Sequence, residues 1–340
     1  MTENYSPSII KDVSDIISDH IVRECPLDIR TNGSLIKLGH PMVTKSALSL
    51  KNFNQITLYE PEELVITLGP GVNLTELKST LKDKNQELRF EPPDYGPLLG
   101  NLAGQGSIGG IIGCNLSGPK RFMAGAARDF ILGVEGVSGY GHGFKAGGRV
   151  VKNVTGYDVS KLVTGAYGTL AGLTSFTLKL SPLAEAEISI IVHGLDNVEA
   201  IKLMSKIAIC PFETSGLAYV PENISTKKSS LMVVRIEGVS ASLKERTDAI
   251  LKIIGSRSFE ICQSEESKII WKAICDVEPF NPPTNIPLWK ISVPPSQAAD
   301  VIAKHNPDFY YFDWAGGLIW MSSNDIPKLK SGAFWLIRGP

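Results

Sequence analysis

One stretch of the chain, residues 104–180, is too rich in glycine to form long helices or a continuous apolar core. It begins GQGSIGGIIGCNLSGPKRFMAGAARDF and continues through VTGYDVSKLVTGAYGTLAGL. Small hydrogen-bonding side chains stand between the glycines: Ser107, Asn115, Ser117, Asn153, Thr155 and Thr169. A backbone without side chains can bring its N–H groups close to an extended anionic ligand. The stretch therefore predicts short strands, tight loops and one wall of a cofactor groove.

A nicotinamide dinucleotide site is the first alternative for this stretch. Gly104, Gly106 and Gly109 match the spacing G-x-G-x-x-G, and Asp129 follows downstream. That fingerprint functions directly after a buried strand. Residues 91–100 read EPPDYGPLLG, and no central strand accommodates so much proline and glycine. The context argues against this alternative, whereas turns that bind no ligand stay open as a second one.

The composition of the chain limits its class. Its 340 residues are 43% hydrophobic and 20% charged, which is typical of a soluble protein with about two domains. A net charge of −1 gives no electrostatic reason to expect nucleic acid as a partner. No apolar run has the length of a membrane span, and no signal peptide is evident. We expect a cytoplasmic protein that reaches the inner face of the cell membrane only through partners.

The five cysteines form no C-x-x-C pair. This pattern predicts reduced thiols and argues against a metal or iron–sulfur site within the chain.

The hydrophobic pattern changes at Pro182, and we predict two domains, residues 1–182 and 183–340. In the first we expect helices over 8–24 and 73–83, strands over 27–30 and 173–180, and an apolar, β-rich run over 58–68 that is centred on 64–66. In the second we expect strands over 187–193, 231–237 and 287–293, helices over 197–209, 242–254 and 296–304, and paired strands within 309–321. This alternation predicts a second α/β domain with a largely antiparallel sheet.

The order of several short motifs resembles the FAD-binding domain shared by vanillyl-alcohol oxidase, p-cresol methylhydroxylase and D-lactate dehydrogenase. The motifs are the helix–strand–loop at 8–40, PGVNLTEL at 70–77, SIGG at 107–110, NLSG at 115–118, ARD at 127–129, GYD at 156–158 and GAYGTL at 165–170. They are specific as an ordered set. The resemblance implies an α+β fold, namely a PCMH-type FAD-binding domain of two α+β subdomains over residues 1–182.

Two further signatures lie outside that domain. They are IWKAI at 270–274 with PLWKISVP at 287–294, and FDWAGGLIW at 312–320. In these the chain is similar to the E subunits of bacterial glycolate oxidase, so the resemblance covers nearly its whole length. It implies that residues 183–340 are a smaller, cap-like interaction domain with a mainly antiparallel sheet.

The resemblance also implies non-covalent FAD, with the pyrophosphate between two loops whose amides face the phosphates. The implied cofactor-binding residues are Asn32, Gly33, Ser34, Ser107, Ile108, Gly109, Gly110, Asn115, Ser117, Gly118, Gly156, Tyr157, Asp158, Gly168, Thr169 and Leu170.

Three features depart from the family pattern. The first loop reads TNGSL at 31–35 where relatives carry a sequence close to Gly-Gly-x-Ser-Lys, so Lys37 is the candidate substitute for the missing lysine. His40 lies near this loop, but we expect no covalent flavin there. The chain ends LIRGP without the Asn-Pro-Gly motif that usually follows in relatives, and we expect the usual C-terminal end to be lacking.

Groups that could act on a substrate are few. His142, in GYGHG, is expected at an exposed hairpin tip. Arg121 and Arg128 are candidates for contact with phosphate or substrate, and the tryptophans at 271, 289, 314 and 320 are expected in the core or at a subunit interface. We assign no catalytic residue and no metal ligand.

The resemblance implies an FAD-binding subunit of a glycolate (2-hydroxy acid) dehydrogenase complex. A larger FAD-containing subunit would oxidise glycolate to glyoxylate, and an iron–sulfur subunit would pass electrons to quinone. Two alternatives stay open: a self-sufficient flavin oxidase of a small hydroxy acid or alcohol, and a structural subunit without flavin.

Overall fold

The structure is a computed structural model that describes residues 3–40, 42–148, 157–225, 227–281 and 284–339. Contacts between residues divide the chain into two compact units. Unit 1 consists of residues 1–37, 41–117 and 126–183, and unit 2 of residues 38–40, 118–125 and 184–340. The short segment 118–125 therefore packs with the second half of the chain, although it follows one of the predicted cofactor loops directly.

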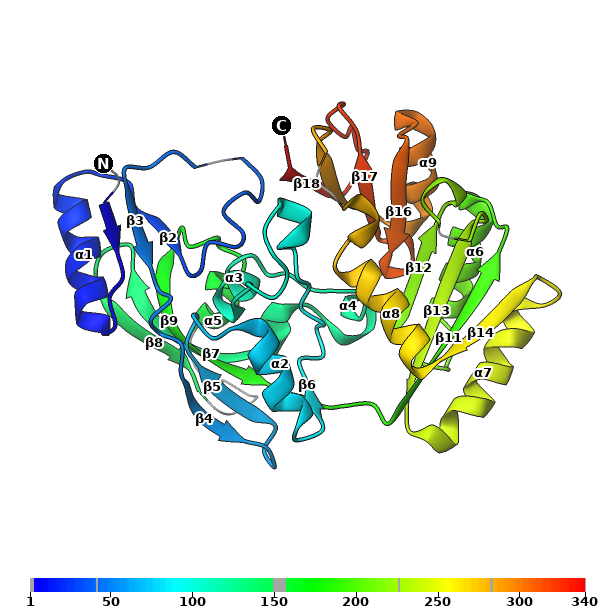
Figure 1. The fold of residues 1–340 in the computed structure, drawn as a ribbon, viewed down its shortest axis with the longest axis horizontal. Coiled ribbons are helices and arrows are strands. Elements are labelled where there is room, and N and C mark those ends of the chain that lie inside the picture. Colours follow the sequence, from blue (N-terminus) through cyan, green and yellow to red (C-terminus); the bar gives the residue numbers. More distant parts are fainter. Residues whose placement is uncertain (1–2, 41, 149–156, 226, 282–283, 340) are drawn as a thin grey trace. The chain divides into compact units, whose positions relative to one another are not determined.

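Unit 1 begins with a three-stranded parallel sheet beside one helix (Figure 1). The strands are β1 (Glu3–Tyr5), β3 (Ser46–Ser49) and β2 (Asp28–Arg30), in that spatial order. Helix α1 (Ile10–Val22) buries Val13 and Ile17, one turn apart, in a cluster with Leu48. The predicted helix over 8–24 and strand over 27–30 are confirmed.

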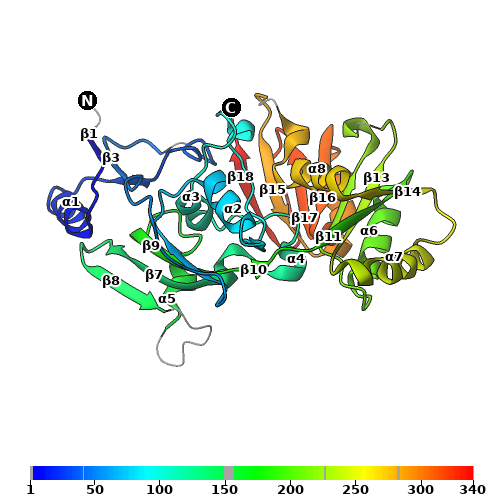
Figure 2. The ribbon, with the colours of Figure 1, turned by 60° about the horizontal axis from the view of Figure 1, so that its bottom comes forward.

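The larger sheet of unit 1 has five antiparallel strands in the order β4-β5-β9-β7-β8 (Figure 1), and Figure 2 shows β9, β7 and β8 from another side. Their bounds are β4 (Ile56–Glu60), β5 (Val65–Leu68), β9 (Ala171–Lys179), β7 (Ile131–Ser138) and β8 (Gly143–Gly147). A further pair joins β6 (Gln86–Glu87) to β10 (Ser181–Pro182). Strand β9 confirms the strand predicted over 173–180, and the β-rich run predicted over 58–68 contains β5 and most of β4, with a turn between them.

The other helices of unit 1 are short. They are α2 (Leu74–Lys82), α3 (Ile108–Gly113) and α5 (Val159–Val163), with 3-10 turns η1 (Pro97–Leu99) and η2 (Ala127–Phe130). Asn73 caps α2 because its Oδ1 accepts the N–H groups of Thr75 and Glu76. In the described part of the glycine-rich stretch, helix α3 spans only six residues, as the glycine content predicts.

Unit 2 is built on one eight-stranded antiparallel sheet in the order β14-β11-β13-β12-β16-β17-β15-β18. The strands are β11 (Ala186–His193), β12 (Gly216–Val220), β13 (Leu231–Gly238), β14 (Phe259–Gln263), β15 (Leu288–Ser292), β16 (Phe309–Asp313), β17 (Leu318–Ser322) and β18 (Ala333–Arg338). The helices are α4 (Arg121–Ala124), α6 (Asn197–Ala208), α7 (Ser240–Ile254), α8 (Ser264–Cys275) and α9 (Pro295–His305), with turns η3 (Glu222–Ile224), η4 (Glu278–Phe280) and η5 (Trp314–Gly316).

The two faces of this sheet differ. One face packs Ile190, Val234 and Ile319 with α6, α7 and α9 into the main core of the unit. Helix α8 lies on the other face, where its Trp271 ring fills the space that a Cβ at Gly216 would need (Figure 1). Because successive side chains of a strand point to opposite faces, the residues of the apolar core lie on one face and a different set of residues lies on the face that α8 covers.

The predicted fold class is confirmed: an α+β fold whose second sheet is antiparallel. The elements predicted over 187–209, 231–254 and 287–321 are present. The sequence analysis did not predict β12, β14, α8 or β18. Strands β14 and β18 are edge strands with a mixture of exposed and buried residues, so their hydrophobic pattern is weak.

His142 lies in the β7–β8 connection, where its carbonyl accepts the Ser138 N–H, and it is exposed as expected. Within the residues that the structure describes, no helix combines the length and apolarity needed to cross a membrane.

Candidate flavin site

The loop after β2 contacts the segment that leads into α3, so the structure brings two predicted cofactor loops together. Thr31 Oγ1 lies 2.5 Å from Ser107 Oγ. Asn101 Nδ2 donates to the carbonyl oxygen of Ser34 at 2.9 Å. These bonds join segments about 70 residues apart in the chain into one surface of unit 1.

The start of α3 requires glycine because three segments meet there. A Cβ at Gly109 would lie 2.6 Å from Pro70 Cβ, 2.7 Å from Pro70 O and 2.9 Å from Thr31 Cγ2. Cβ atoms do not approach other atoms that closely, so any larger residue would push these segments apart. The absence of a side chain at Gly109 therefore allows these loops to pack closely.

Backbone N–H groups in the two loops have different roles. Those of Ile108 and Gly109 donate to Val72 O at 3.0 Å and Pro70 O at 2.9 Å, so both have backbone partners within unit 1. The N–H groups of residues 32–34 donate to no other described residue. The first loop thus offers the available donors, while the second loop shapes the surface beside them.

Leu35 stands at the position for which the family resemblance implies lysine. A Cβ on Gly110 would lie 3.1 Å from Leu35 Cδ1, so this leucine rests on the first turn of α3. Because the end of a leucine side chain can move, Gly110 tolerates a larger residue better than Gly109 does. Lys37, the candidate substitute, is exposed at the end of the loop.

A third predicted loop packs at the other end of α3. Gly165 N–H donates to Ile112 O at 3.1 Å, and Tyr167 N–H donates to Gly113 O at 2.9 Å. Tyr167 has a φ of 54°, so the loop makes a sharp turn there. The following residues, Gly168, Thr169 and Leu170, lead into β9, and Thr169 Oγ1 donates to Ala166 O at 2.6 Å.

Asn115 and Ser117 brace the chain beyond α3. Asn115 Oδ1 accepts the N–H of Arg128 at 3.1 Å, and Ser117 Oγ accepts the N–H of Ala127 at 2.9 Å. Ser117 is buried. These two oxygens therefore fix the turn at 126–128.

The remaining predicted residues lie elsewhere. Asp158 caps α5, accepts the N–H of Lys161 at 3.1 Å and has Lys161 Nζ 3.1 Å away. Burial would raise the pKa of Asp158, but that N–H and charge outweigh it, so the pKa is lowered. Tyr157 is 93% exposed. Gly156 lies outside the described residues, and Gly118 belongs to unit 2.

The segment that contains Gly118 is anchored in unit 2 by a buried ion pair. Lys120 Nζ lies 3.0 Å from Glu237 Oε1, and Arg235 Nε lies 3.6 Å from Glu237 Oε2. All three side chains are buried. Burial would raise the pKa of Glu237, but the charges of Lys120 and Arg235 outweigh it, so the pKa is lowered and the carboxylate is held ionised.

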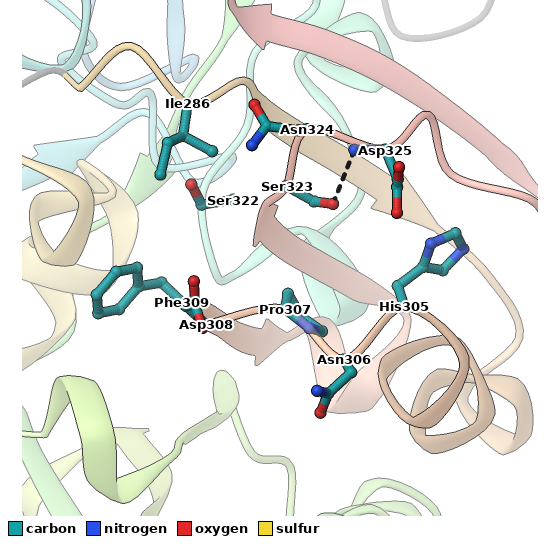
Figure 3. A pocket seen from close by; sticks show the side chains of 10 residues that line it. All are labelled: Ile286, His305, Asn306, Pro307, Asp308, Phe309, Ser322, Ser323, Asn324 and Asp325. Carbon is teal, nitrogen blue, oxygen red and sulfur yellow. Dashed lines mark hydrogen bonds between the residues drawn. The ribbon is translucent and has the colours of Figure 1, made fainter.

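A separate hollow of about 230 Å³ lies at one end of the unit 2 sheet (Figure 3). The end of α9, the start of β16 and the turn after β17 line it with His305, Asp308 and Asp325, and Ser323 Oγ accepts the Asp325 N–H there. His305 Nε2 accepts the N–H of Lys328 at 3.1 Å. The hollow is smaller than most ligand sites and contains none of the predicted cofactor residues.

Sequence comparisons identify the family of the chain. A family model described as an FAD binding domain matches residues 5–147. Glycolate oxidase subunit GlcE of Escherichia coli (strain K12) is 32% identical, and the match covers 97% of this chain and 85% of that protein. Glycolate oxidase subunit GlcD of Bacillus subtilis (strain 168) is 28% identical over 78% of this chain, which spans about half of that protein (53%).

The solved structure of alkyldihydroxyacetonephosphate synthase has a TM-score of 0.68 with 12% identity, covering 93% of this chain and 69% of that one. At this identity the likeness concerns the fold alone. The family model and the curated relatives define an FAD-linked oxidoreductase. The chain belongs to the family of the glycolate oxidase subunit GlcE, and its cofactor is FAD.

Proposed function

We propose that this chain is the FAD-carrying subunit of a complex that oxidises glycolate, or a closely related 2-hydroxy acid, to the 2-oxo acid. The observation that carries the proposal is the similarity to GlcE over 97% of the chain. The loops that join at Thr31, Ser107 and Gly109 support it, because they form a surface suited to an extended phosphate-containing cofactor. FAD, when bound, supplies the acceptor for a hydride from the substrate.

The two ends of α3 divide the proposed cofactor contacts. We place the pyrophosphate beside the available N–H groups of Asn32, Gly33 and Ser34. On this proposal the second loop, from Ser107 to Gly110, acts mainly by shape, with contributions from Asn115, Ser117 and Gly118 beyond it. The loops at 156–158 and 168–170 would contact the remaining parts of a non-covalent FAD. Residues 1–182 would then be the flavin domain and 183–340 the interaction domain.

The proposed partners follow from the resemblance to glycolate oxidase. A larger FAD-containing subunit would oxidise the substrate, and an iron–sulfur subunit would pass the electrons to quinone. In the described residues no group of three or more His, Cys, Asp or Glu side chains could hold a metal ion. Attachment of the cytoplasmic assembly to the membrane would also come from a partner.

The test is to co-express the chain with the two proposed partners, and to prepare the same complex without it. FAD is quantified by absorbance, and glycolate-dependent reduction of an artificial dye is followed. We expect the complete complex to contain more FAD and to lose most of its activity when this chain is left out. Equal activity with and without the chain would contradict the proposal. Turnover by the isolated chain would instead favour a self-sufficient oxidase.

A further inference from the structure

Most of the buried charge in unit 2 has partners within the chain. The face of the sheet opposite its apolar core is a charged face, with Glu187, Arg235, Glu237, Lys290 and Asp313. The Arg235 guanidinium lies over the Trp271 ring at 4.5 Å. Near Trp314, the Arg121 guanidinium lies 4.5 Å and Lys290 Nζ 5.2 Å from the centre of the indole ring. These groups are engaged within the chain, so we place no ligand on the charged face.

The hollow at the end of the same sheet is different. Residues 305–309 and 322–325 line it together with Ile286, and the proposed flavin contacts lie in other segments (Figure 3). Its volume is about 230 Å³, whereas sites for small molecules usually measure about 300–1,000 Å³. A hollow of this size fits one side chain of a partner better than it fits a cofactor.

Two carboxylates flank this hollow without a cation beside them. Asp308 and Asp325 stand on opposite sides of it, and both residues are exposed (Figure 3). In the described part of the chain neither of them forms an ion pair. Lys304 Nζ donates instead to the Lys328 carbonyl at 3.2 Å, and neither lysine lines the hollow. The two carboxylates therefore give the hollow a negative potential.

The end of helix α9 adds to this potential. The last carbonyl groups of a helix carry partial negative charge, and α9 ends at His305, which lines the hollow. His305 Nε2 accepts the N–H of Lys328 at 3.1 Å. A ring nitrogen that accepts a hydrogen bond carries no proton, so His305 brings no positive charge in this contact. The hollow therefore favours a cation and disfavours anions.

A buried hydroxyl in the wall of the hollow also lacks a partner. Ser322, at the end of β17, lines the hollow and is only 6% exposed. Among the described residues its Oγ makes no hydrogen bond, whereas the neighbouring Ser323 Oγ accepts the Asp325 N–H at 3.1 Å. Buried polar groups without a partner are unfavourable, so a donor from outside the chain would stabilise Ser322.

The rim of the hollow is apolar and open to solvent. Phe309 and Ile326 are both exposed, and Ile286 is half-buried in the wall. Exposed aromatic and aliphatic groups around a desolvated polar centre are typical of protein–protein interfaces, where arginine is enriched. The surroundings thus favour a protein side chain as the occupant.

We propose that this hollow receives an arginine side chain of a partner subunit. The inference rests on the proposed function in that it needs a partner, and it goes further because it locates a contact. A guanidinium carries five N–H donors, and Asp308, Asp325 and Ser322 offer oxygen acceptors. Its flat face suits the Phe309 ring, and its apolar stem suits Ile286. An ammonium has three donors and no flat face, so arginine should be preferred to lysine.

The test titrates the purified full chain with N-acetyl-arginine methylamide, which has an arginine side chain and no charged ends. The matched probe is the citrulline analogue, which has nearly the same shape and no charge. Binding is followed by NMR of labelled isoleucine methyl groups, because Ile286 lines the hollow. The variants are Asp308→Asn and Asp325→Asn. Asp300→Asn is the control, since Asp300 lies on α9, is exposed and does not line the hollow.

We expect the arginine probe to shift the Ile286 signal in a saturable way and the citrulline analogue to leave it in place. Asp308→Asn and Asp325→Asn should each raise the Kd of the arginine probe by about 5- to 10-fold, and Asp300→Asn should match the wild type. Melting temperatures identify a variant that fails to fold, in which case the other variant decides. No saturable shift, equal binding of both probes, or an unchanged Kd in both variants would overturn the inference.

A second measurement tests the source of the arginine. The chain with both Asp308→Asn and Asp325→Asn is co-expressed with the proposed partner subunits, and the amount of partner that co-purifies is compared with that for Asp300→Asn. We expect the double variant to retain less partner. Equal retention would overturn the assignment to a partner subunit and point to a free guanidinium compound. If even the wild type retains no partner, the proposed function fails, while the titration still decides whether the hollow binds a guanidinium.

Discussion

The loops around α3 in unit 1 and the charged sheet face in unit 2 are built from different materials. Around α3, backbone groups and small side chains make the contacts between the loops, as in the contact of Thr31 with Ser107 and of Gly109 with Pro70. In unit 2, the buried charges of Lys120 and Glu237 form an ion pair, and the Arg235 guanidinium lies over the Trp271 ring. The difference teaches that a large cofactor of constant shape can be fitted by backbone geometry, whereas a charged cluster depends on pairing across the fold.

The largest effect on the charged face of the unit 2 sheet is expected for Lys120→Met. It leaves Glu237 buried with Arg235 as its remaining close cation, and we expect unfolding to become easier by about 3 kcal/mol. Lys145→Met removes an exposed ion pair with Glu135 and should cost at most about 0.5 kcal/mol. Denaturant titration of both variants measures the contrast. Equal losses would show that the buried pair contributes no more than a surface pair.

The corresponding substitution in the loops around α3 is Gly109→Ala. The added Cβ would clash with Pro70 and Thr31, so we expect a loss of about 2 kcal/mol and most of the bound FAD. Gly143→Ala on β8 is the control, because a Cβ there meets nothing within 4 Å. Absorbance of the purified flavin and thermal melting provide the measurements. Full FAD retention by Gly109→Ala would rule out the close approach as a requirement for binding.

Acid should affect the charged face through Glu237. Because its folded-state pKa lies below the ordinary value of 4.5, its ionised form contributes stability that is present above pH 4.5 and lost as pH falls through the lowered pKa. Glu237→Gln should be less stable than the wild type at pH 7, with the gap closing as pH falls below 4.5. Melting temperatures of both proteins across that range test this. A gap that is independent of pH would assign the loss to packing.

The smallest effect is expected for Thr31→Val, which removes one side of the hydroxyl contact with Ser107. We expect a loss of about 1 kcal/mol and weaker FAD binding, since Ser107 then lacks that partner. Thr57→Val, on exposed strand β4, removes a weaker bond to Thr67 O and serves as the control. Calorimetric titration of the flavin-free proteins with FAD compares the two. Unchanged FAD affinity in Thr31→Val would show that the loops stay joined without this bond.

Much of the fold could be predicted because its signals are local. The helix from Ile10 to Val22 and the strand from Ala186 to His193 follow from hydrophobic period alone. Edge strands such as β18 could not be predicted in this way, because exposed Phe334 and Trp335 interrupt any regular pattern.

The loops of the candidate flavin site could be predicted from the sequence, but which of their N–H groups are available as hydrogen-bond donors could not. Glycine marks the places where segments approach closely, so the motif at 107–110 could be recognised from the sequence. Which N–H groups are occupied depends on Val72 and Pro70, which come from another loop, and no property of residues 107–110 reveals that. Likewise Arg121, Lys290 and Trp314 share no motif and meet only because the sheet places β15 beside β17 and the segment 118–125 returns to it.

The sequence by itself determined the two kinds of region: a glycine-rich half that binds through its backbone, and a half of alternating strands and helices. Those properties depend on residues that are neighbours in the sequence, so they can be predicted from short segments. Only the tertiary structure decided that the second loop shapes the surface while the first offers free N–H groups, and that four cations gather on one side of a sheet. Hydrogen bonds and ion pairs require two partners, and here the partners are separated by tens to hundreds of residues.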